Sequence, residues 1–169
     1  MVTTATCPTA PRPTGRYVIG LGSNRRGRHG GPAQEVRAAL AAIGGVQAVS
    51  PIAITPPLGP SIRAFANAAA LVGSDESPPA LLARLKAIER DFGRRRGRRW
   101  GARVIDLDIV LWSGGAWSSP GLTVPHPAWR QRAFVVDPLA AIVPGWRDPE
   151  SGLNVRQLGR RLTRRRPLA

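Results

Sequence analysis

The stretch from Arg98 to Leu111 constrains this chain most, because it ends in an aliphatic run interrupted only by two aspartates. Such a run, beginning at Val104, is typical of a buried strand. Side chains alternate along a strand, so Asp106 and Asp108 should share one face and their aliphatic neighbours the other. Two neighbouring carboxylates repel each other unless cations lie between them, which indicates hard divalent ions, Mg²⁺ above all. An edge strand with a solvated acidic face remains the alternative.

The chain is strongly basic: 25 lysine and arginine residues against 10 acidic ones give a formal net charge of +15. Lys86 is the only lysine, and the other basic residues are arginines, whose planar forks suit bidentate binding of phosphate. Arg98, Arg99 and Arg103 beside the aspartate pair therefore favour a polyphosphate ligand. A basic surface also attracts nucleic acid, which is the rival hypothesis. The sequence contains no helix-turn-helix, zinc-finger or aromatic RNA-binding signature, so we expect no specific nucleic-acid partner.

The 169 residues suit one domain with a single core, expected over residues 17–162 between a disordered leader (1–16) and a basic tail (163–169). No apolar run is long enough to cross a bilayer, and the leader has no apolar signal core. Cys7 is the only cysteine, which excludes an internal disulfide. We expect a cytoplasmic protein without membrane contacts, acting as a monomer.

Strand and helix patterns alternate along the chain. Strands are expected over 17–24, 46–55, 65–72 and 104–111, and helices over 32–43, from Ser77 to Gly93, and over 155–162. Residues 113–121 are polar and glycine-rich, which predicts a connecting loop. The order β-α-β-β-α-β is that of an α+β, ferredoxin-like core, with a mostly antiparallel sheet, helices packed on it and extra C-terminal elements. That order hosts many functions and by itself indicates none.

Several local motifs allow both a functional and an ordinary structural interpretation. Phe65 and Asn67 should share a strand face, which suits a flat heterocycle, although phenylalanine is more often a core residue. Glu89 lies off the apolar stripe of its helix, and a solvated glutamate is the simple interpretation. His126 is held between prolines, which suits phosphate contact or the cap of a short helix. The arginines of 94–99 repel one another until an anion binds, so this loop should be mobile when empty.

Taken together, these motifs resemble the 6-hydroxymethyl-7,8-dihydropterin pyrophosphokinases of folate biosynthesis. The resemblance runs from about residue 17 to 162. It rests on Gly22-Ser23-Asn24, Thr55-Pro56-Pro57-Leu58-Gly59, Phe65-x-Asn67, Glu89 with Gly93-Arg94-x-Arg96, Arg99-Trp100-Gly101-x-Arg103-x-x-Asp106-x-Asp108, Leu122-Thr123-Val124-Pro125-His126-Pro127 and Arg132-x-Phe134.

The resemblance implies transfer of the β,γ-diphosphate of ATP to the hydroxymethyl oxygen of the pterin, by in-line displacement with two Mg²⁺ ions. The implied catalytic residues are Arg94, Arg103, Asp106 and Asp108, with the two aspartates holding the metals. ATP contacts are implied for Glu89, Arg96, Trp100, Arg103, Ile109, Thr123, His126 and Arg132. Pterin contacts are implied for Thr55, Pro56, Pro57, Leu58, Phe65, Asn67 and Phe134, with the two phenylalanines stacking on the ring.

The chain departs from the family pattern at a few positions. Gly121 stands where some members carry a basic residue, so one ATP contact is expected to be missing. Ile62 replaces a residue that is often polar, and Lys86 replaces an amide found in some members. The loop from Arg94 to Trp100 is one residue shorter than in some relatives. These departures should affect ligand affinity more than the reaction itself. A basic nucleic-acid-binding module and a catalytically inactive relative remain the alternatives to the enzyme.

Overall fold

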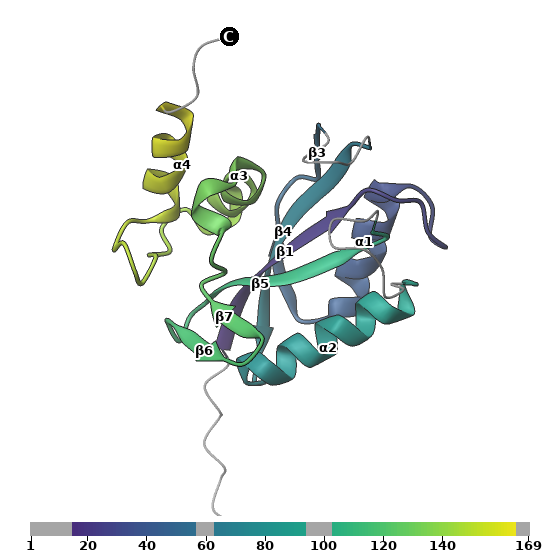
Figure 1. The fold of residues 1–169 in the computed structure, drawn as a ribbon, viewed down its shortest axis with the longest axis horizontal. Coiled ribbons are helices and arrows are strands. Elements are labelled where there is room, and N and C mark those ends of the chain that lie inside the picture. The colour runs from purple at the N-terminus through teal and green to yellow at the C-terminus, as the bar shows by residue number, and fades with distance from the viewer. Residues whose placement is uncertain (1–14, 57–62, 94–102, 165–169) are drawn as a thin grey trace, which may run out of the picture.

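The structure is a computed structural model that describes residues 15–56, 63–93 and 103–164. Its centre is an antiparallel sheet in the order β2-β4-β1-β5, with β3 also paired to β4 (Figure 1). This is the strand order of a ferredoxin-like core, as the sequence predicts. The strands are β1 (Gly15–Ser23), β2 (Val46–Val49), β3 (Ala53–Thr55), β4 (Phe65–Ser74) and β5 (Asp106–Trp112).

Two helices, α1 (Pro32–Ile43) and α2 (Pro78–Asp91), cover one face of the sheet (Figure 1). Both begin with proline in the first turn, where no backbone N–H is required. Gly44 has φ +68° just after α1 and Gly93 has φ +86° just after α2, a backbone conformation that glycine adopts without strain. Leu81 and Leu85 of α2 pack with Val36 of α1 in the main hydrophobic core.

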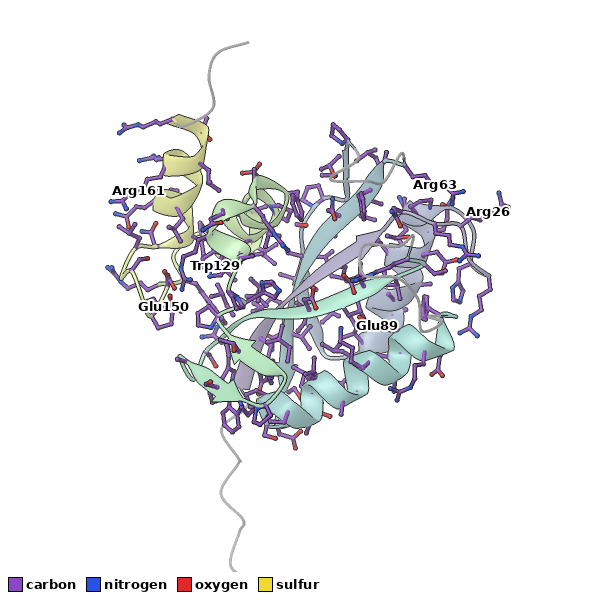
Figure 2. The ribbon with its side chains drawn as sticks, in the orientation of Figure 1. Arg26, Arg63, Glu89, Trp129, Glu150 and Arg161 are labelled. Carbon is purple, nitrogen blue, oxygen red and sulfur yellow. The ribbon has the colours of Figure 1, made fainter. Side chains whose placement is uncertain are left out.

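The opposite face carries a second hydrophobic cluster, formed with α3 (Ala133–Ile142) and α4 (Val155–Arg164). Val18 and Ala69 contribute to it from the sheet, and Trp129 from the short helix η1 (Trp129–Gln131). Figure 2 shows Trp129 between the sheet and α3. α3 packs directly on β4, whereas α4 packs on α3. This second layer covers only part of the face, and the remaining part carries the polar residues described below.

The predicted strand over 46–55 is wrong as one element, because it is interrupted at Ser50 and Pro51. Ser50 Oγ accepts a hydrogen bond from the Ala69 N–H at 2.9 Å, and Pro51 has no N–H to continue a ladder. The predicted connection over 113–121 also needs correction, because it contains β6 (Trp117–Ser119), which pairs with β7 (Leu122–Val124) in a hairpin.

The expected leader and tail lie mostly outside the described residues, and β1 already begins at Gly15. None of the helices in the described ranges has the length and apolar character needed to cross a bilayer.

Candidate active site

The two aspartates lie on β5, on the face of the sheet that also carries α3. Leu107 and Ile109, which alternate with them, are buried in the core on the other face, as the alternation predicts. The side chains of Asp106 and Asp108 remain 26% and 44% exposed. Their partners on β1 are Gly22 and Gly20, which have no side chain to cover the carboxylates. The pair is therefore accessible from above the sheet.

A row of polar residues crosses the sheet at the level of Asp106. Gly22 of β1 pairs with Asp106 on one side and with Asn67 of β4 on the other, so all three positions share one face. A β-carbon at Gly22 would lie 3.2 Å from Asn67 Oδ1, which shows how closely the amide approaches the β1 backbone. Asn67 Nδ2 donates to Thr55 Oγ1 of β3 at 2.8 Å. The predicted heterocycle-binding residues thus lie beside the predicted metal-binding pair.

Arg103 is held next to this row by Asn24. The Asn24 backbone N–H donates to the Arg103 carbonyl at 3.2 Å, and the Arg103 N–H donates to Asn24 Oδ1 at 2.8 Å. The Arg103 guanidinium then pairs with Asp106, with 2.5 Å between Nη1 and Oδ2. The sequence interpretation of Gly22-Ser23-Asn24 as a turn that approaches a ligand missed this role of Asn24, because its partner is 79 residues away.

Glu89 is buried, so its interpretation as a solvated glutamate is wrong. β5 pairs only with β1 among the described strands, and its outer edge therefore needs other partners for its backbone groups. Glu89 Oε1 accepts the Leu107 N–H at 2.8 Å, and Lys86 Nζ donates to the Leu107 carbonyl at 2.9 Å. Figure 2 shows Glu89 at this junction of α2 and β5. Contact between Glu89 and ATP stays a prediction. Lys86 is a further residue of the site, which the sequence marked only as a departure from the family pattern.

A pocket of about 340 Å³ opens beside Asp108, between α2, β5 and the β6–β7 hairpin. It brings together Ile109, Thr123 and His126, three residues for which the resemblance implies contacts with ATP. Its further lining residues were not among the predicted contacts: they are Leu82, Lys86, Ser119, Gly121, Leu122 and Pro127. The sequence marked Leu82 as an apolar residue that packs inward, because it belongs to the apolar stripe of its helix. Leu122 and Pro127 belong to the motif around His126, and Gly121 is a departure from the family pattern, whereas Ser119 had no signal because β6 was not predicted.

His126 is oriented by its own backbone turn. Its N–H donates to the Val110 carbonyl at 3.0 Å, and the Ala128 N–H donates to His126 Nδ1 at 3.3 Å. With Nδ1 accepting, Nε2 is the ring nitrogen available to a ligand in the pocket.

Arg132 and Phe134 lie at the start of α3, where the second layer meets the open part of the sheet. The Arg132 guanidinium lies 5.9 Å from the centre of the Phe134 ring. Phe134 and Phe65 are both partly exposed, as stacking residues must be. The predicted contacts Pro57, Leu58, Arg94, Arg96 and Trp100 lie outside the described residues, as does the loop over 94–99.

The aspartate pair suits Mg²⁺ better than a metal that needs a full set of protein ligands. Within the described ranges, no group of three or more His, Cys, Asp or Glu side chains could hold a metal. Mg²⁺ commonly binds through one or two carboxylates and fills its other positions with water and substrate phosphate. Asp106 and Asp108, half-exposed beside a pocket, match this arrangement.

Comparison with known proteins assigns the family. A family model described as 7,8-dihydro-6-hydroxymethylpterin-pyrophosphokinase (HPPK) matches residues 18–144. The chain belongs to this family. An HPPK-family relative from Pseudomonas aeruginosa, named 2-amino-4-hydroxy-6-hydroxymethyldihydropteridine pyrophosphokinase, is 40% identical over 141 residues, covering 80% of this chain and 85% of the relative. A relative of the same name from Synechocystis is 42% identical over 100 residues, covering 59% of this chain and 51% of the relative.

Solved HPPK domains confirm the fold. The crystal structure of wild-type HPPK-DHPS from Plasmodium falciparum matches 90% of this chain with a TM-score of 0.72, at 14% sequence identity. The chain covers 42% of that protein, and about half the length of the Synechocystis relative. At this identity the Plasmodium structure supports the architecture alone. The family membership expected from the motifs is confirmed by the family model and by the Pseudomonas relative.

Proposed function

We propose that this chain transfers the β,γ-diphosphate of ATP to 6-hydroxymethyl-7,8-dihydropterin and releases AMP. The observation that carries the proposal is the row Asn67–Gly22–Asp106 across three strands. It sets an amide suited to a heterocycle edge directly beside a carboxylate pair suited to phosphate-bound metal. The pocket next to Asp108 has the size of a small-molecule site and lies where a nucleotide joined to that metal would extend.

The pterin is proposed to bind on the open part of the sheet. Asn67 and Thr55, already hydrogen-bonded to each other, present amide and hydroxyl groups to the polar edge of the ring. Phe65 from β4 and Phe134 from the start of α3 supply flat apolar surfaces for stacking. Pro56 leads into the loop whose Pro57 and Leu58 are proposed to complete this site. Family membership and the clustering of the described residues support the assignment.

The triphosphate is proposed to extend from the pocket toward Asp106. His126 and Thr123 contact the nucleotide from the hairpin side, with Ile109 beneath it and Arg132 approaching from α3. Arg103, with Arg94 and Arg96, neutralises phosphate charge, and Trp100 belongs to the same loop. Asp106 and Asp108 are proposed to hold two Mg²⁺ ions, which supply charge stabilisation to the phosphates when bound.

The proposed reaction is a direct displacement at the β-phosphorus. A bond forms between the hydroxymethyl oxygen and this phosphorus, while the bond to the bridging oxygen of the α-phosphate breaks. AMP leaves with that oxygen, and the hydroxyl proton passes to solvent. No side chain becomes covalently modified, so the protein acts by positioning and charge.

The product nucleotide tests this proposal. Protein incubated with Mg·ATP and 6-hydroxymethyl-7,8-dihydropterin should release AMP in step with pterin diphosphate, measured by chromatography. Asp106→Asn should lower turnover by at least about a hundredfold with an unchanged circular dichroism spectrum, because it removes the charge but keeps the shape. Asp137→Asn, at an exposed position of α3, is the matched control and should keep full activity.

Three results would contradict the proposal. ADP as the stoichiometric product would mean attack at the γ-phosphorus. Full activity of Asp106→Asn would remove the assigned metal site. No nucleotide turnover, together with tight sequence-selective nucleic-acid binding at physiological salt, would instead favour the basic binding module.

A further inference from the structure

Each aspartate of the pair already has a cation of the protein beside it, and the two cations come from different elements. Arg103, just before β5, pairs with Asp106 at 2.5 Å. Lys86, on α2, lies with Nζ 3.6 Å from Asp108 Oδ1. The lysine reaches Asp108 around the outer edge of β5, from the face of the sheet that α2 covers.

Lys86 is anchored independently of Asp108. Its ammonium donates to Glu89 Oε1 at 2.7 Å and to the Leu107 carbonyl at 2.9 Å. Glu89 is itself fixed, because its side chain is fully buried and accepts the Leu107 N–H. An ammonium has three N–H donors arranged tetrahedrally, so two can hold these partners while the charge remains next to Asp108. The only lysine of a chain otherwise provided with arginine stands at this position.

The contact with Asp108 differs from the two anchoring contacts. A separation of 3.6 Å is an ion pair without a direct hydrogen bond, whereas the bonds to Glu89 and Leu107 are short. Asp108 is also the more exposed member of the pair. Asp108 can therefore turn toward another cation while Lys86 stays in place.

We propose that Lys86 is a positioning residue that neutralises Asp108 before metal binds, so that the free protein binds divalent cations weakly and takes them up together with the nucleotide. The inference rests on the proposed function for the identity of the nucleotide. Lys86 also lines the pocket, so its charge faces both the carboxylate and an incoming triphosphate. The negative charge of the triphosphate offsets the positive charge of these protein groups. Binding of metal ions to the aspartates then becomes favourable.

Mn²⁺ binding to the nucleotide-free protein tests this, with unbound Mn²⁺ measured by electron paramagnetic resonance. Lys86→Gln removes the charge but keeps a donor for Glu89 or Leu107, and should tighten Mn²⁺ binding about two- to fivefold, as expected for a partly exposed ion pair. Lys86→Arg, which keeps the charge, should bind Mn²⁺ like the wild type.

Arg156→Gln provides the matched control for net charge, because it removes one positive charge from an exposed position of α4, which packs on α3 and lies apart from α2 and β7 (Figure 1). Mn²⁺ affinity should not change in this variant. A purely structural role of Lys86 would lower thermal stability without tightening Mn²⁺ binding. Unchanged or weaker Mn²⁺ binding by Lys86→Gln, at wild-type folding, would overturn the proposal.

The wild type alone supplies a second test that does not depend on how any variant folds. Its Mn²⁺ affinity should rise at least tenfold on adding a non-hydrolysable ATP analogue, beyond the Mn²⁺ bound by the analogue in solution. Equal affinity with and without the analogue would also overturn the proposal. The outcome is separable from the proposed function, because Mn²⁺ binding needs no turnover and the AMP assay needs no metal titration.

Discussion

At the scale of single residues, Asn24 has the clearest role among those that the motifs left undefined. It is nearly fully buried and brackets Arg103 with two hydrogen bonds, one from its backbone and one to its side chain. Arg103 in turn contacts Asp106. Asn24 therefore acts on the carboxylate pair through Arg103. Without the Asn24 side chain, only the hydrogen bond from the Asn24 N–H to the Arg103 carbonyl would remain of the two.

Replacing Asn24 with alanine should lower kcat about tenfold while changing the affinity for ATP much less, because the loss concerns the placement of one charged group. The part-buried Arg103 backbone N–H also loses its acceptor, which should cost about 1–2 kcal/mol of stability. Steady-state kinetics and thermal unfolding measure the two effects. Asn154→Ala is a suitable control, since Asn154 Oδ1 accepts the Gln157 N–H at the start of α4, far from the site. A similar loss of stability with unchanged kcat in both variants would contradict the positioning role.

At the scale of elements, the sequence predicts the parts that depend on local periodicity. The alternation in β5 and β4 correctly places Asp106 with Asp108, and Phe65 with Asn67, because face assignment needs only neighbouring residues. The glycines after α1 and α2 likewise mark where those helices end. These local signals were sufficient for the ferredoxin-like core.

What the sequence could not predict depends on partners distant in the chain. The break after β2 is stabilised by a hydrogen bond from the Ala69 N–H to Ser50 Oγ. The buried Glu89 is stabilised by a hydrogen bond from the Leu107 N–H, on the outer edge of β5. Neither partner can be inferred from helix or strand periodicity. The same holds for Lys86, which the motifs identify only as a departure from an amide.

Gly121, between β6 and β7, allows a separate prediction about ATP affinity. This glycine lines the pocket, has φ +81°, and has no atom within 4 Å of the position where a β-carbon would lie. Gly121→Arg has room for its β-carbon and should place a cation at the pocket and tighten ATP binding severalfold, at a cost of about 1 kcal/mol for the backbone conformation. Isothermal titration calorimetry and thermal unfolding measure the two.

Gly121→Ala separates charge from strain in this experiment. It should lose about as much stability as Gly121→Arg and should gain no ATP affinity. If both variants bind ATP equally well, the missing basic residue has no role in affinity at this position.

At the scale of the whole molecule, one sheet separates two hydrophobic clusters, and the site lies where the second cluster ends. Val18 and Ala69 are covered by the α3 layer, whereas Gly20, Gly22 and Asn67 continue the same face beyond it. The incomplete second layer therefore leaves this part of the sheet face open, where the pterin is proposed to bind. The position of α3, which carries Phe134, depends on how firmly the C-terminal part is attached.

A buried ion pair provides part of this attachment. Arg130 donates to both carboxylate oxygens of Asp148, at 2.7 and 2.6 Å, and the Asp148 side chain is fully buried. Burial by itself raises the pKa of Asp148, but hydrogen bonds from Arg130, Ser151 and the Glu150 backbone outweigh it and lower the pKa to about 2. The same contact with Asp148 raises the pKa of Arg130. Asp148 is thus favoured as a carboxylate in the folded protein.

The pH dependence of stability follows from this shift. Because the folded pKa lies below the unfolded value of about 3.9, the carboxylate stabilises the fold above pH 4, and this stabilisation is lost as pH falls from about 4 toward 2.

Asp148→Asn should cost about 3 kcal/mol at neutral pH, or roughly 6–12 °C in Tm, because it leaves Arg130 without its main partner. The variant should also lose stability less steeply than the wild type between pH 4 and 2. Thermal unfolding at a series of pH values measures both effects, with Asp137→Asn as the exposed control. A parallel pH profile for Asp148→Asn and the wild type would show that this pair does not govern the acid sensitivity of the fold.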